Sequence, residues 1–157
     1  MKALVVYDSV FGNTEKVAQA MGEALGAQTL RVADVKPEHV AGLDVLVVGS
    51  PTRAFSPTPA IKSWLSGLPS KSLQGVKVGA FDTRIALEDV NSGFLNFMVK
   101  IFGYAAKPIG NRLVRKGGDL VLSLEGFYVQ GSEGPMKDGE LERAVDWVQE
   151  MLPQSDG

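Results

Sequence analysis

The sequence contains no cysteine and a single histidine, His39, among its 157 residues. Without cysteine the protein has no disulfide, no thiolate metal site and no iron–sulfur ligation, and one histidine excludes a multi-histidine centre. A formal net charge of −2 also argues against a nucleic-acid-binding protein, which normally carries a basic surplus. We therefore expect no metal and no nucleic-acid partner.

Long apolar runs are missing as well. None reaches the ~20 residues that a membrane-spanning helix needs. The chain enters a strand pattern at Lys2 to Tyr7, which leaves no space for a signal peptide before it. We expect a cytoplasmic protein that does not bind membranes. No linker, repeat or low-complexity tract is visible, so residues 1–157 are expected to form a single domain.

Short apolar runs rich in β-branched residues alternate with amphipathic helical patterns along the chain. Continuous apolar runs are typical of strands buried on both faces, as in a parallel sheet. We expect strands at 3–7, 29–32, 45–49, 76–81 and 120–124 (extending towards 129), helices at 14–25, 59–68, 94–104 and 141–152, and a short turn or helix at 37–43. This alternation predicts an α/β fold with a parallel sheet and helices on both faces.

The segment after the first strand has the composition of an anion-binding loop. Hydroxyls at Ser9 and Thr14 flank a turn at Gly12, and the helix that follows contributes the positive end of its dipole. Successive backbone N–H groups in such a loop can hold a phosphate monoester without a lysine. A simpler interpretation is that Asn13 caps the helix and Gly12 only turns the chain.

These residues resemble a known signature. The spacing of Val5, Val6, Tyr7, Ser9, Gly12, Thr14 and Ala18 closely resembles the FMN phosphate loop of flavodoxins. The resemblance extends over the whole element order and fits the short-chain form. It implies a doubly wound three-layer sandwich with a five-stranded parallel sheet of order 2-1-3-4-5.

The resemblance also implies that FMN is held by the loops after strands one, three and four. The matching residues are Ser9, Val10, Phe11, Gly12, Asn13 and Thr14 in the first loop, Pro51, Thr52, Arg53, Ala54 and Phe55 in the second, and Asp82, Thr83 and Arg84 in the third. Two of them, Arg53 and Arg84, bring positive charge to the expected cofactor site. Nearby cations favour the reduced, more negatively charged cofactor.

A basic stretch follows the third loop. Between Asp89 and Asp119 there is no acidic residue, whereas five cations fall there: Lys100, Lys107, Arg112, Arg115 and Lys116. We interpret the stretch as a solvated helix face and turn. The alternative is a docking patch for an acidic partner or a phosphorylated ligand.

Three functions remain open. The leading hypothesis is an FMN-binding electron carrier that serves a redox partner protein, with no catalytic side chain, because the cofactor carries the redox chemistry. The second is an FMN-dependent NAD(P)H:quinone-type oxidoreductase, and the third is a flavodoxin-fold module that has lost the flavin. We expect a monomer, with a dimer as the alternative.

Overall fold

The computed structural model describes residues 1–53, 56–85, 93, 103–131 and 133–153. The strands of its sheet are β1 (Ala3–Tyr7), β2 (Gln28–Arg31), β3 (Val45–Pro51), β4 (Lys77–Ile85), β5 (Asp119–Leu120) and β6 (Glu125–Val129). The α-helices are α1 (Asn13–Leu25), α2 (Pro37–Val40), α3 (Pro59–Gly67), α5 (Ala106–Arg115) and α6 (Glu140–Gln149). No helix of the described residues is both long enough and apolar enough to cross a membrane.

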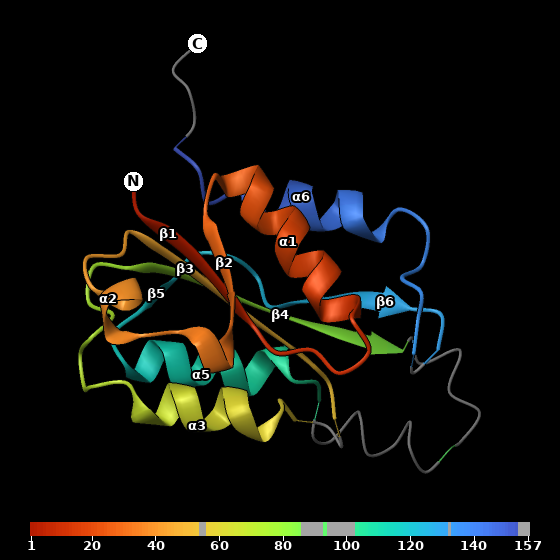
Figure 1. Cartoon of the computed structure of the whole chain (residues 1–157), viewed down its shortest axis with the longest axis horizontal. Coiled ribbons are helices and arrows are strands. Elements are labelled where there is room, and N and C mark those ends of the chain that lie inside the picture. The colour runs from red at the N-terminus through yellow and green to blue at the C-terminus, as the bar shows by residue number, and fades with distance from the viewer. Residues whose placement is uncertain (54–55, 86–92, 94–102, 132, 154–157) are drawn as a thin grey trace.

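The described strands form one sheet of order β2-β1-β3-β4-β5, and all their pairings are parallel. Helices α1 and α6 cover one face of this sheet, and α3 and α5 cover the other (Figure 1). The predicted doubly wound α/β fold and its strand order are confirmed. The carboxyl ends of β1, β3 and β4 therefore meet at one edge of the sheet, where ligands of such folds bind.

The last position of the sheet differs from the expected single strand. Both β5 and β6 pair with β4, β5 at Lys77 and Val78 and β6 from Phe81 to Ile85. The ladder is interrupted between them, where the Ser123 carbonyl accepts a hydrogen bond from Trp147 Nε1 of α6 at 3.1 Å. The strand predicted at 120–124 is thus replaced by two shorter strands around this contact.

Alternate residues of the central strands belong to two separate hydrophobic cores, one on each face of the sheet. Val5 and Tyr7 of β1 pack with the buried faces of α1 and α6, whereas Leu4 and Val6 pack with those of α3 and α5. This two-sided burial explains why the strands read as continuous apolar runs. The sheet is thereby held rigidly beneath the loops that follow its strands.

Helix α5 was not predicted from the sequence. Pro108 lies in its first turn, where a backbone N–H has no helical acceptor and proline is tolerated. Gly110 faces the sheet, since a Cβ at this position would lie 2.6 Å from Leu124 Cδ2. The helix predicted at 94–104 falls on residues 94–102, which lie outside the described residues, and on the two residues that follow them.

Candidate cofactor site

A cavity of about 380 Å³ opens at the carboxyl ends of β1, β3 and β4. It brings together residues from all three predicted loops: Ser9, Val10, Phe11, Asn13, Thr14, Pro51, Thr52, Arg53, Thr83 and Arg84. Ile85 and Val129 also line it and were missed as site residues. Ile85 lies beyond the predicted end of its strand at residue 81, whereas Val129 lies where the last strand was expected to end and carries no signal of a cofactor contact. A volume of this size is typical of small-molecule and cofactor sites.

The other predicted residues are placed differently. Gly12 is the N-cap of α1 and has φ of 92°, a left-handed conformation that favours glycine. Asp82 lies fully buried behind the cavity wall rather than in it. Ala54 and Phe55 lie outside the described residues.

The loop after β1 presents unpaired backbone donors. The first helical hydrogen bond runs from Lys16 N to Gly12 O at 3.1 Å, and no side chain caps α1. Among the described residues, the N–H groups of Val10, Phe11, Asn13 and Thr14 have no hydrogen-bond acceptor. The interpretation of Asn13 as a simple helix cap is therefore not supported. Free amides at a helix N-terminus are suited to an anion.

Two hydroxyls complete this loop. Ser9 Oγ accepts a hydrogen bond from Gly12 N at 3.1 Å, which leaves its O–H free to donate. Thr14 Oγ1 lies 2.8 Å from Thr83 Oγ1, which links the loop to the end of β4. Arg31 of β2 supports the loop from outside by donating from Nη1 to the Ser9 carbonyl at 3.0 Å. The donors are thus held in place before any ligand binds.

The loop after β3 is closed by a pair of backbone hydrogen bonds. Arg53 N donates to Ser56 O at 2.8 Å, and Ser56 N donates to Arg53 O at 3.0 Å. Thr52 N donates to the Thr83 carbonyl at 3.0 Å, which joins this loop to the one after β4. The side chain of Arg53 is exposed at the cavity.

The side chain of Arg84 is fixed in the cavity wall by several close contacts. Its Nε and Nη2 each donate to a carboxylate oxygen of Asp82 at 2.7 Å, and Ala106 N donates to the same carboxylate at 2.9 Å. The guanidinium lies 3.6 Å from the centre of the Tyr104 ring. Gly126 also adjoins the guanidinium, since a Cβ at this position would collide with it.

The electrostatics of this pair follow from its burial. Desolvation raises the pKa of Asp82 above its usual range and outweighs the hydrogen bonds from Arg84 and Ala106. Burial alone would lower the pKa of Arg84, but the hydrogen bond and charge of Asp82 raise it. The positive charge that the sequence placed at Arg84 is therefore largely offset by Asp82, while Arg53 has no described acidic partner.

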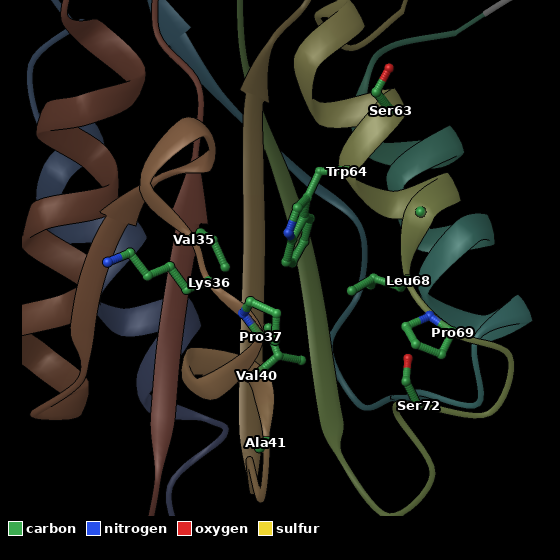
Figure 2. A pocket seen from close by; sticks show the side chains of 11 residues that line it. Val35, Lys36, Pro37, Val40, Ala41, Ser63, Trp64, Leu68, Pro69 and Ser72 are labelled. Atoms are coloured by element: carbon green, nitrogen blue, oxygen red, sulfur yellow. The ribbon is translucent and has the colours of Figure 1, made fainter.

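A second and larger cavity, of about 540 Å³, lies between α2 and α3. Figure 2 shows the side chains of Trp64, Leu68 and Val40 around it, with the Lys36 ammonium directed away from them. It shares no lining residue with the cavity at the strand ends. Its mostly apolar walls offer no place for a phosphate, so we do not assign the cofactor to it.

Comparison by sequence gives limited information. No protein-family model matches the chain. An uncharacterized protein of Methanocaldococcus jannaschii, MJ0534, is 32% identical over 92 residues. The match covers 50% of this chain and only 24% of that protein, so the chain spans about a quarter of the length of the curated relative that it matches.

Comparison of structures is more informative. A flavodoxin from the domain Archaea has a TM-score of 0.75 and 21% identity, with 96% of each chain covered. Flavodoxin 1 from Bacillus cereus has a TM-score of 0.73 and 14% identity, with 96% of this chain and 97% of that chain covered. Rubredoxin oxygen:oxidoreductase from Desulfovibrio gigas has a TM-score of 0.70 and 19% identity over 94% of this chain and 34% of that one.

The chain therefore has a flavodoxin-like fold. The resemblance that the first loop suggested is confirmed at the level of the fold over nearly the whole chain. The same fold also occurs as one part of a larger oxidoreductase.

Proposed function

We propose that this chain binds FMN in the cavity at the ends of β1, β3 and β4 and acts as an electron carrier. The observation that carries the proposal is the set of unpaired amides in residues 10–14, which adjoin the hydroxyls of Ser9 and Thr14. Such donors fit a phosphate dianion, and the flavodoxin-like fold favours FMN as its bearer. Bound FMN would supply the electron-transfer chemistry.

The side chains of the chain then have binding and shielding roles. The loop of residues 9–14 would hold the phosphate, and Pro51 to Arg53, Thr83 and Arg84 would enclose the rest of the cofactor. Val10 and Phe11 are 48% and 54% exposed at the rim of the cavity. We propose that they contact a redox partner protein, because exposed apolar groups beside a site are typical of interaction surfaces.

We also propose the domain organisation, the location and the oligomeric state of the protein. Residues 1–157 would form one domain that acts as a cytoplasmic monomer between a reductase and an acceptor. A dimer is the alternative oligomeric state.

A second candidate function is an FMN-dependent oxidoreductase that uses NAD(P)H and a quinone-type acceptor. The similarity to part of rubredoxin oxygen:oxidoreductase favours it, since the fold there belongs to an enzyme. Rapid, saturable oxidation of NAD(P)H by the purified holoprotein without a separate reductase would support this function over the carrier.

The test is a titration of the apoprotein with FMN and with riboflavin, in which binding is measured by the quenching of flavin fluorescence. We expect FMN to bind far more tightly than riboflavin, because only FMN offers a phosphate to the loop. An absorption spectrum of the purified protein should show bound oxidised flavin that heating releases. Failure to bind either flavin would instead favour the flavin-free module.

A further inference from the structure

Helices α3 and α5 and the segments that follow them carry only basic charges, whereas the α2 region on the same face of the sheet carries Asp34 and Glu38. Residues 59–76 and 106–116 contain Lys62, Lys71, Lys107, Arg112, Arg115 and Lys116 and no Asp or Glu. Among the described residues, none of these cations forms an ion pair. On the opposite face, α1 and α6 carry Glu15, Glu23, Glu140, Glu142 and Asp146 against Lys16 and Arg143. Although the chain has a net charge of −2, the described surface formed by α3 and α5 is thus positive.

Two hollows flank the C-terminal end of α3 on this basic side. One is polar, about 300 Å³ in volume, and is lined by Ser66, Ser70, Arg112 and Arg115 among others. The other is the apolar cavity beside Trp64 (Figure 2). Residues 64–72 supply walls to both, so the two hollows lie next to each other.

The turn between the hollows is fixed by Lys116. Its Nζ donates to the carbonyls of Ser66 at 3.2 Å and Leu68 at 2.7 Å, which are among the free carbonyls at the end of α3. Lys116 therefore has a structural role in the fold. Arg115 has no described partner, and Arg112 has only a long bond, at 3.3 Å, from Nη1 to the Pro108 carbonyl.

We propose that this end of α3 is a docking surface for an acidic segment of a partner protein. Carboxylates of the segment bind Arg112 and Arg115, whose guanidinium groups match carboxylate geometry. An apolar side chain of the segment enters the hollow beside Trp64, as anchor residues do in protein interfaces. A free anion or a nucleic acid would leave this apolar hollow unused. No residue of the surface lines the cofactor cavity, so the inference does not depend on FMN.

The two tryptophans provide the test. Trp64 lines the apolar hollow, whereas Trp147 is buried on the opposite face with its Nε1 bonded to Ser123 O. We would titrate the ¹⁵N-labelled protein with the peptide Glu-Glu-Glu-Phe-Leu-Glu-Glu-Glu and follow both indole N–H signals by NMR. The Trp64 signal should shift saturably while the Trp147 signal stays in place.

Variants separate the contributions. R112Q/R115Q should weaken peptide binding by about tenfold, because the contacts of two guanidinium groups with carboxylates at a partly exposed surface are lost. The matched control K16E, on α1, lowers the net charge by the same two units and should retain the affinity. A peptide with serine in place of Phe and Leu should no longer move the Trp64 signal. Added salt should strongly weaken the binding of the acidic peptide. An unchanged Trp147 signal and thermal midpoint would verify that R112Q/R115Q is folded.

Three outcomes would overturn the inference. The first is a Trp64 signal that does not move, and the second is an equal peptide affinity of R112Q/R115Q and the parent. The third is an affinity for inorganic phosphate or a single-stranded oligonucleotide that equals the affinity for the peptide. The titration is performed on both apoprotein and FMN-treated protein. A failure to bind FMN would therefore contradict the proposed function and leave this test intact.

Discussion

The hydroxyl oxygens of Thr14 and Thr83 lie 2.8 Å apart, which ties the first turn of α1 to the end of β4. Both residues are buried, with 1% and 5% of their surfaces exposed. One hydroxyl donates to the other, so the pair retains a single O–H for a ligand. The phosphate loop and the loop after β4 are thereby joined into one unit before a cofactor arrives.

Replacing Thr14 by valine should selectively weaken FMN binding. The variant keeps the shape of the side chain but removes a donor to the phosphate, which costs about 1.5–3 kcal/mol, or roughly 10- to 150-fold in the dissociation constant. Riboflavin has no phosphate, so its affinity should hardly change. Fluorescence titrations with both flavins measure the difference, and an equal loss for both would show that Thr14 does not contact the phosphate.

Replacing Arg84 by methionine should destabilise the apoprotein. Asp82 would be left fully buried without its partner, and breaking a buried ion pair in this way costs about 3–5 kcal/mol. Urea unfolding at pH 7 measures the free energy of unfolding. The double variant D82N/R84M removes the stranded charge and should recover part of the loss. If it were no more stable than R84M, the buried charge would not be the cause.

Glu140 should make the stability depend on pH. Burial alone would raise the pKa of Glu140, but hydrogen bonds from Arg143 and the Tyr128 amide lower it below its ordinary value. Its contribution to stability is therefore present above the pKa of the unfolded chain, about 4.3, and is lost as the pH falls through the lower folded value.

The variant E140Q should accordingly lose about 1–3 kcal/mol of unfolding free energy at pH 7. The difference from the parent should be nearly the same when urea unfolding is repeated at pH 5 and should shrink at pH 3. E142Q, altered at an exposed position of the same helix, is the control and should differ little at any pH. A stability difference between E140Q and the parent that stays constant with pH would contradict the lowered pKa of Glu140.

Arg53 should influence the reduction potential of bound FMN more than Arg84 does. Arg53 is exposed at the cavity without a described acidic partner, whereas Arg84 is paired with Asp82. R53E should disfavour the reduced, more negative cofactor by roughly 1 kcal/mol, which is about 40 mV for one electron. Spectroscopic redox titration measures the potential. The shift should diminish in 1 M salt, and an unchanged or higher potential would refute the prediction.

The parallel sheet and the region of the site could be predicted because their signals are local. The apolar runs at 3–7 and 45–49 and the spacing of Ser9, Gly12 and Thr14 are properties of contiguous residues. Burial of a strand on both faces leaves its mark directly in the residue pattern. These signals were sufficient to predict the parallel sheet, whereas the strand order and the set of loops at the cavity followed from the resemblance to flavodoxins that the spacing carries.

Only the tertiary structure decided the features that depend on partners distant in the sequence. The division of the last strand follows from the bond between Trp147 and Ser123, and the orientation of Arg84 follows from Asp82 and from the missing side chain of Gly126. Helix α5 forms although it contains Pro108 and Gly110, because the sheet accepts its apolar face. Hydrogen bonds and close contacts between remote segments arise only when the chain has folded, so no local pattern encodes them.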